Sequence, residues 1–548
     1  MKKIFITIFT MVLVYGFYLI SYNNNFIDKI VYELIDDYRG LSSDSKGETI
    51  LNDEIVVQIK LDVDRFSEST NIDKNDQARY RKAAEEYYTL INDQTFKILS
   101  LNKYKSVYIS KYSPYIMYTF DSDKYYNYKS AIANEINNND FIESACIKDN
   151  IVYNKEQMIN TMYSAGALDL YQDQDPDYTG YGIKVGIMEP GLVDASAVCF
   201  SSGQVTTMPN NSGTVSDHAT YMAAYIGGSD GIASDVKIYS ANIYGNIVEE
   251  IEWLISSGCN IINMSYGEVN PTGRYASSSA LCDYYAYEYW VTFVAAVGNE
   301  GNGVNYVNNP ALGYNVVSVG SGTYAASVDS FSSVLEVDGP PKPTILARGN
   351  SVLLESLMIC NTGTSVSCAV TTGIIALLLE KYNAMTYRPD QIIAMLTCSA
   401  YQSPYAIFLS CGLNESGGAG LIRYDNFQNQ YASYQYITNR NGESGTELKV
   451  INVNLTAGTN YKASACWLAY SEGTVASKKF TDYDIFVIGP DNSVIAEATS
   501  INSNVELVSF TAETTGTYTI KLMQYGELKT TKDRIIFCHG EAPEALLR

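Results

Sequence analysis

The chain has 548 residues, of which 18% are charged and 46% hydrophobic, a composition typical of a folded protein with two to four domains and not of a disordered chain. The formal net charge of -23 argues against a nucleic-acid partner, which would need a basic face. The ten cysteines are scattered without a C-x-x-C pair, so neither a disulfide framework nor a zinc site is expected, although single disulfide bridges stay open. Because there are only two histidines, a multi-histidine metal site is not expected either.

The N-terminal segment, residues 1–22, predicts export. Two lysines precede an apolar run from Ile4 to Ile20, the pattern of an export signal. No A-x-A cleavage site follows, and the run is near the lower limit of length for crossing a bilayer. We therefore expect an extracellular or cell-surface protein, and both a cleaved signal peptide and a retained membrane anchor stay open.

Residues 50–150 predict a small α+β domain. Strands are expected at 54–61, within 105–120 and at 141–148, and amphipathic helices at 75–93 and 123–139. This order predicts an antiparallel sheet covered by two helices. The domain ends just before the segment that carries the candidate chemistry.

Residues 155–427 predict an α/β domain, and residues 430–548 an all-β domain. In the first, continuous apolar runs such as IKVGIM, VKIYSANIY and VTFVAAVGN alternate with helical patterns. Strands that are apolar on both faces indicate a parallel sheet with helices on both sides. In the second, short strands separated by Gly, Asn and Asp indicate a β-sandwich or jelly roll.

Four side chains at strand ends or helix starts of the α/β region are suited to acyl transfer: Glu189, His218, Asn299 and Ser365. A serine hydroxyl becomes nucleophilic when a neutral imidazole accepts its proton, and a carboxylate on the other ring nitrogen orients that imidazole. An asparagine amide and a backbone N–H at a helix start can hold the oxyanion.

Taken singly, each of these residues also has a plainer interpretation. Glu189 could be a solvated strand end, His218 a half-buried histidine, the Gly-Asn pair a turn, and the serine a helix N-cap. Asp194 and Asp217 compete for the role of the acid, but neither ends a buried strand. The joint occurrence in one order along the chain favours the catalytic interpretation.

The motifs around these residues resemble those of the subtilases, the subtilisin-like serine proteases. The matching segments are MEPG at 188–191 for the strand ending D-[ST]-G, HATYMAA at 218–224 for H-G-T-H-V-A-G, NMSYG at 263–267 for N-x-S-x-G, AAVGNEG with Asn299 for A-A-G-N, and GTSVSCA at 363–369 for G-T-S-x-A-x-P. The resemblance implies a subtilisin-like parallel sheet with helices on both faces.

The resemblance also implies the roles of the residues. Ser365 is expected to be the nucleophile, His218 the general base and acid, and Glu189 the carboxylate that orients the imidazole. Asn299 is expected to donate to the oxyanion. Peptide substrate is expected to add as a strand along Ser265, Tyr266 and Gly267. The chemistry needs no cofactor or metal, and a structural calcium ion stays open.

The flanking domains extend the resemblance. Residues 50–150 resemble the subtilase propeptide, an inhibitor and intramolecular chaperone, which implies a zymogen that cleaves itself between Cys146 and Ala165. Residues 430–548 resemble the jelly-roll domain of some bacterial subtilases. The implied partners are a protein or peptide substrate and the protein's own propeptide, and the implied setting is an exported bacterial protein.

Departures from the family motifs keep two other functions open. Glu189 adds one methylene to the usual aspartate, Pro190 replaces Ser or Thr, and Tyr221 replaces the second histidine of the helix motif. These changes permit a pseudoprotease that binds or scaffolds another protease. A surface adhesin that uses the C-terminal domain is the other alternative.

Overall fold

The computed structural model describes residues 54–147 and 178–543, with gaps at 64–65, 71, 100, 102–103, 122–130, 133–135, 137–141, 210, 212, 269, 271, 302–305, 335–339, 404–406, 441 and 475–478. The expected export segment at 1–22 and the expected cleavage region after residue 147 lie outside the described residues, as does most of the helix expected at 123–139. The chain divides into two compact units, residues 1–70 with 83–148 and residues 71–82 with 149–548.

The smaller unit is built on an antiparallel sheet of order β2-β3-β1-β4. The strands are β1 (Glu54–Leu61), β2 (Ser106–Ile109), β3 (Tyr115–Asp121) and β4 (Ile142–Ile147). A short helix, α3 (Phe66–Ser69), follows β1, and the long helix α4 (Gln77–Ile98) starts in the larger unit and continues into this one. The expected strands are therefore present, whereas the expected first helix runs five residues beyond its predicted end at residue 93.

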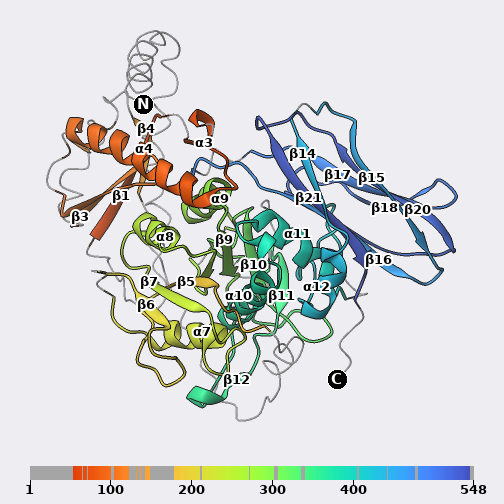
Figure 1. The fold of residues 1–548 in the computed structure, drawn as a ribbon, viewed down its shortest axis with the longest axis horizontal. Helices are drawn as coiled ribbons and strands as arrows, with labels where there is room; N and C mark the ends of the chain where they lie inside the picture. Colours follow the sequence, from red (N-terminus) through yellow and green to blue (C-terminus); the bar gives the residue numbers. More distant parts are fainter. Residues whose placement is uncertain are drawn as a thin grey trace, which may run out of the picture. The chain divides into compact units, whose positions relative to one another are not determined.

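The larger unit contains a parallel sheet of order β11-β10-β9-β8-β5-β7-β6 (Figure 1). Its strands are β5 (Lys184–Glu189), β6 (Val205–Thr207), β7 (Lys237–Asn242), β8 (Ile261–Met264), β9 (Thr292–Ala296), β10 (Val316–Ser321) and β11 (Ile345–Ala347). Strand β5 pairs with β7 on one side and with β8 on the other, so the strand order reverses there. In open parallel sheets such a reversal point is where the carboxyl ends of strands present a site.

Helices cover both faces of this sheet. Helix α7 (Asp217–Gly227), α10 (Thr364–Lys381), α11 (Pro389–Ser399) and α12 (Tyr424–Tyr431) share one hydrophobic core with the strands. Helices α8 (Ile247–Ser256) and α9 (Ser277–Tyr289) lie on the other face. Gly186 of β5 faces α8, because a Cβ added there would lie 3.0 Å from Cδ1 of Leu254. The adjacent Val185 and Ile187 point into the first core.

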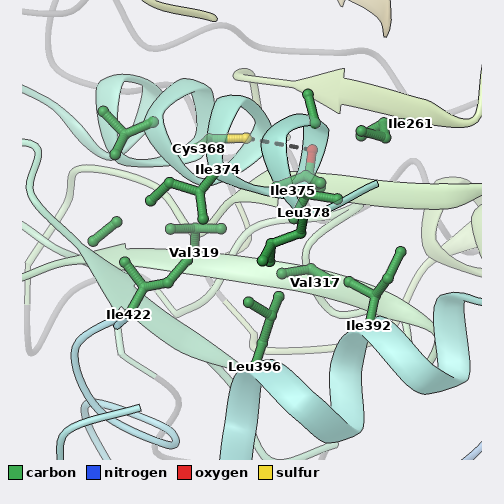
Figure 2. Packing of buried hydrophobic residues seen from close by; sticks show 14 of the residues in the cluster. Ile261, Val317, Val319, Cys368, Ile374, Ile375, Leu378, Ile392, Leu396 and Ile422 are labelled. Atoms are coloured by element: carbon green, nitrogen blue, oxygen red, sulfur yellow. Dashed lines mark hydrogen bonds between the residues drawn. The ribbon is translucent and has the colours of Figure 1, made fainter. Parts of the chain in front are cut away.

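Helix α10 is the centre of that core. It is buried along nearly its whole length, and within the described ranges it is the one helix long and apolar enough to cross a membrane. Figure 2 shows its side chains gathered with those of α11 around strand β10, among them Ile374, Leu378, Ile392, Leu396, Val317 and Val319. A two-stranded ribbon, β12 (Val352–Leu354) and β13 (Ile359–Asn361), with the short helix η1 (Glu355–Leu357) between its strands, precedes α10, and the short helix η2 (Asn383–Met385) follows it.

The C-terminal part is a β-sandwich of two four-stranded antiparallel sheets, with orders β14-β21-β16-β19 and β15-β20-β17-β18 (Figure 1). The strands are β14 (Gln435–Asn439), β15 (Thr446–Leu455), β16 (Asn460–Trp467), β17 (Tyr483–Ile488), β18 (Val494–Ala498), β19 (Val505–Thr511), β20 (Gly516–Gln524) and β21 (Asp533–Glu541). Alternating side chains from both sheets, including Trp467, Tyr483 and Phe537, fill its interior.

The β-sandwich is joined to the α/β domain through buried polar contacts. The Arg534 guanidinium contacts the buried Asp390 carboxylate with Nε at 2.6 Å and Nη2 at 2.9 Å. Lys462 Nζ donates to the carbonyl oxygens of Thr397 at 3.0 Å and Ala400 at 2.7 Å near the end of α11. Burial lowers the pKa of the Lys462 ammonium to about 8.

Residues 72–82 are attached to α8 and α9 within the larger unit. Arg81 donates from Nη1 to the Ile255 carbonyl at 2.8 Å and from Nη2 to the Tyr289 carbonyl at 3.2 Å. These carbonyls lie in the last turns of the two helices, where the helix dipole favours a cation. Tyr80 hydroxyl adds a 2.9 Å hydrogen bond to Glu288 in α9.

Candidate active site

The predicted site residues converge at the carboxyl edge of the parallel sheet. Glu189 is the last residue of β5, His218 lies in the first turn of α7, and Ser365 lies in the first turn of α10. Ser265 directly follows β8, and Asn299 follows β9 by a short turn. Each of the five residues lies where a strand ends or a helix begins at this edge, as the position of the reversal point predicts.

Glu189 contacts His218 directly. Its Oε2 lies 3.0 Å from Nδ1 of the imidazole. Its Oε1 accepts a 2.8 Å hydrogen bond from the backbone N–H of Ser265 and a 3.4 Å hydrogen bond from the Asn263 amide. The carboxylate is fully buried. One carboxylate therefore joins the imidazole to the end of strand β8.

The turn after Glu189 is held against the segment that leads into α7. Gly191 N–H donates to Asn242 Oδ1 at 3.0 Å, and Leu192 N–H donates to the Thr214 carbonyl at 2.9 Å. Gly191 has φ +101°, and a Cβ there would lie 2.5 Å from Cβ of Ser216, so only glycine fits. Ser216 is the N-cap of α7 and immediately precedes its first turn, so this turn sets the position of His218 relative to Glu189.

Ser265 also contacts Ser365. The Ser365 hydroxyl donates to the Ser265 carbonyl at 2.9 Å, and the Ser265 hydroxyl donates to the Ser365 carbonyl at 3.0 Å. Ser365 is 5% exposed, whereas the His218 side chain is 29% exposed. The serine hydroxyl is thus directed at the end of β8 in this state, and a rotation about χ1 is required to turn it elsewhere.

Asn299 is held by the residue that precedes the serine. Its Oδ1 accepts hydrogen bonds from the backbone N–H of Thr364 at 2.8 Å and from the Thr364 hydroxyl at 3.0 Å. With the oxygen fixed in this way, the NH₂ group is the end of the amide that can donate elsewhere, and no partner for it is seen among the described residues. This NH₂ group can donate a hydrogen bond to an oxygen on which negative charge develops beside the N-terminus of α10.

The structure separates the competing acids from this site. Asp194 is bound to Ser196, whose side-chain and backbone hydrogen bonds lower the pKa of that carboxyl, and Asp217 is exposed to solvent. The carboxylate at the imidazole is that of Glu189. Within the described part of the chain, no cluster of His, Cys, Asp and Glu side chains could hold a metal ion.

Three polar residues of the site were missed by sequence reasoning. Asn263 and Thr364 hold Glu189 and Asn299 respectively, and Asn242 holds the turn at Gly191. Asn263 and Thr364 stand inside the motifs NMSYG and GTS, so a signal for them existed in the sequence. Asn242 ends strand β7 without any such motif.

Comparisons with known proteins identify the relatives of the chain. The subtilase family model matches residues 145–442. Subtilisin DY from Bacillus licheniformis is 30% identical over 239 residues, covering 39% of this chain and 82% of that protein. The minor extracellular protease Epr from Bacillus subtilis is 28% identical over 226 residues, covering 38% of this chain and 34% of that protein.

Among solved structures, the chain is similar to fervidolysin from Fervidobacterium pennivorans, a keratinolytic enzyme related to subtilisin. The TM-score is 0.49 at 15% sequence identity, covering 84% of this chain and 77% of that one. The family match covers more than half of the chain, and the parallel sheet with helices on both faces is the subtilisin-like fold. The chain therefore belongs to the subtilase family of serine endopeptidases.

Proposed function

We propose that the protein is an exported serine endopeptidase that hydrolyses peptide bonds with a Ser365–His218–Glu189 triad. The observation that carries this proposal is the 3.0 Å contact between Glu189 Oε2 and His218 Nδ1. It leaves Nε2 as the ring nitrogen that can accept a proton from the serine. A buried carboxylate in this position also stabilises the imidazolium that forms when the proton moves.

In the proposed mechanism, the Ser365 hydroxyl turns from the Ser265 carbonyl to His218 Nε2. The oxygen then attacks the scissile carbonyl carbon while Nε2 takes its proton. The oxyanion accepts hydrogen bonds from the Asn299 NH₂ group and from the backbone N–H of Ser365. Collapse breaks the C–N bond, the imidazolium returns the proton to the leaving amine, and water hydrolyses the acyl-enzyme with His218 as base.

Substrate binding is proposed along residues 265–267. This segment extends beyond the end of β8, where an extended peptide can add as a strand through main-chain hydrogen bonds. Tyr266 is buried and forms part of this segment rather than of a solvent-facing pocket. The substrates are therefore proteins or peptides that can present an extended segment.

The N-terminal part of the chain supports a zymogen and export as further parts of the proposal. The small antiparallel sheet with helix α4 supports the α+β domain that the resemblance to a propeptide implies. The charged and apolar pattern of residues 1–22 supports passage to the outside, with a cleaved signal or a membrane anchor as the two outcomes. Cleavage between residues 146 and 165 would then separate the propeptide from the enzyme.

A second candidate function is a pseudoprotease that binds another protein. It is favoured by the direction of the Ser365 hydroxyl, which donates to the Ser265 carbonyl. A serine that stayed in this state would not transfer its proton to His218. The same fold could then hold a peptide without cleaving it.

Labelling with a fluorophosphonate probe distinguishes the two functions. The endopeptidase proposal predicts that the processed wild type is labelled and that Ser365→Ala and His218→Ala are not. Ser493→Ala, which alters an exposed serine of the β-sandwich, is the matched control and should label like the wild type. An unlabelled, folded wild type after processing would refute the proposal and favour the pseudoprotease.

A further inference from the structure

Asn263 links two of the groups that hold the triad in place. It is fully buried in β8, and its Nδ2 donates to Ser265 Oγ at 2.9 Å and to Glu189 Oε1 at 3.4 Å. Ser265 in turn donates its backbone N–H to Glu189 Oε1 at 2.8 Å and its hydroxyl to the Ser365 carbonyl at 3.0 Å. The orientation of one amide therefore bears on the acid and on the segment that contacts the nucleophile.

Two side chains of helix α10 fix the orientation of this amide. Asn263 Oδ1 accepts a 3.0 Å hydrogen bond from the Thr372 hydroxyl and a 3.2 Å hydrogen bond from the Cys368 thiol. An amide has an acceptor at one end and donors at the other, so two donors at Oδ1 leave the NH₂ group to face Glu189. The reversed amide would place its oxygen beside the carboxylate oxygen, and neither of these atoms could donate to the other.

The hydroxyl and the thiol are not equal as donors. The Cys368 thiol has a second acceptor, the Val294 carbonyl at 3.3 Å, and a thiol is a weak donor (Figure 2). Burial raises the pKa of this thiol, so it stays protonated and keeps the hydrogen that it donates. The Thr372 hydroxyl is the stronger donor and lies at the shorter distance from Oδ1. Thr372 is thus the main residue that holds the Asn263 amide.

Helix geometry places both donors on the same face as the nucleophile. Ser365, Cys368 and Thr372 are separated by three and then four residues, the spacing of side chains that follow one another along one face of an α-helix. All three side chains are buried. One helix therefore positions the serine directly and the acid through Asn263.

We infer that Thr372 is a positioning residue for the reaction, which acts through Asn263 to hold the Glu189 carboxylate against His218, with Cys368 as the weaker second donor. The inference rests on the proposed endopeptidase function. Because Thr372 is fully buried and bonds to Asn263, its loss should slow the turnover of bound substrate and not weaken substrate binding. We expect an effect of about 10-fold, below the roughly 10²-fold that a 1 Å misplacement of a catalytic group can cost.

The experiment measures kcat and KM of the processed enzyme for a peptide p-nitroanilide. Thr372→Val exchanges the hydroxyl for a methyl group, and it should lower kcat by about 10-fold with KM nearly unchanged. Thr372→Ser keeps the hydroxyl and should recover most of the wild-type kcat. Thr371→Val is the matched control and should keep the wild-type kcat, because the hydroxyl it removes from the same helix is buried with no hydrogen-bond partner among the described residues.

A double variant tests whether the two donors act on the same oxygen. In Cys368→Ala the Thr372 hydroxyl still donates to Asn263 Oδ1, so kcat should change little. Thr372→Val combined with Cys368→Ala removes both donors, and kcat should fall by about 10²-fold, more than the product of the two single losses. A double loss equal to that product would contradict a shared role.

Fluorophosphonate labelling and thermal unfolding of the same samples separate failure of this inference from failure of the proposed function. A folded, processed wild type without labelling overturns the function itself. A labelled wild type beside a folded Thr372→Val variant with the wild-type kcat overturns the inference and leaves the endopeptidase intact.

A comparison of Thr372→Ser with Thr372→Ala, which differ only in the hydroxyl, decides the matter if Thr372→Val does not fold. Equal kcat values in these two variants overturn the inference. A loss in Thr372→Val that Thr372→Ser does not recover also contradicts it, because packing around residue 372 and not the hydroxyl would then set the rate.

Discussion

Replacing Glu189 by aspartate, the residue that subtilases usually have there, is expected to impair this enzyme. Removing one methylene withdraws the carboxylate by about one C–C bond, roughly 1.5 Å. The contact with His218 Nδ1 then lengthens from 3.0 Å to about 4.5 Å, and the contact with the Ser265 N–H lengthens from 2.8 Å to about 4.3 Å. Both contacts are lost unless the backbone advances.

The turn that follows Glu189 resists such an advance. Gly191 and Leu192 are bonded to Asn242 and Thr214, and Gly191 lies in contact with Ser216. A misplacement of about 1 Å in a catalytic group can cost roughly 10²-fold in rate. We therefore expect Glu189→Asp to lose about 10²-fold in kcat, and Glu189→Gln, which keeps the length but not the charge, to lose about 10⁴-fold.

The assay is single-turnover labelling with a fluorophosphonate together with kcat for a peptide p-nitroanilide, on samples whose folding is checked by thermal unfolding. Glu497→Asp, a shortening of an exposed glutamate in the β-sandwich, is the matched control. A Glu189→Asp variant that labels and turns over as fast as the wild type would refute the reasoning. It would show that the turn can advance and that the hydrogen bonds of Glu189 do not set the rate.

Three further predictions concern stability. Burial, with nearby Asp482 and Glu497, raises the pKa of the Asp484 carboxyl to about 7. The stability that the protonated Asp484 carboxyl contributes is therefore present at pH 4 and lost as the pH rises through 7. Asp484→Asn should flatten the fall in the free energy of unfolding over this range by about 1–2 kcal/mol. A variant whose free energy of unfolding has the wild-type pH profile would contradict this. Arg534→Met should lower the free energy of unfolding in urea by up to about 3–5 kcal/mol, because the buried Asp390 carboxylate then keeps only Arg388, whose Nε lies 3.9 Å from Oδ1. Additional removal of that charge by Asp390→Asn should recover part of the loss. Arg81→Ala should increase hydrogen exchange of residues 77–82 by about 10–100-fold, whereas unaltered protection would show that its two bonds to helix carbonyls do not hold this segment.

The strands could be predicted from the sequence because their patterns are local. Strand β1 has the residues 54–61 that its apolar run indicates, and β5 ends at Glu189 as the Pro-Gly turn indicates. The end of helix α4 could not be predicted in this way. Asn92 and Asp93 have the composition of a helix stop, yet Asn92 is buried and its amide donates to the carbonyls of Ser110 and Ser113. This tertiary contact continues the helix to Ile98.

The site was predictable in its residues and not in its contacts. Glu189, His218, Asn299 and Ser365 stand in recognisable motifs, and the structure places them at one sheet edge. The partner of Glu189 Oε1 is a backbone N–H, which has no signature in a sequence.

The interface between the α/β domain and the β-sandwich determines how the protein responds to cleavage of the linker between them. One hydrophobic cluster includes Cys466, Leu507 and Ile536 of the sandwich together with the α10 and α11 side chains, and Asn315 pairs its amide with both backbone groups of Ala469. The linker is thus not what holds the two parts together. Cutting the chain at residues 432–434, between α12 and β14, should leave both fragments associated, eluting as one species and melting in a single transition.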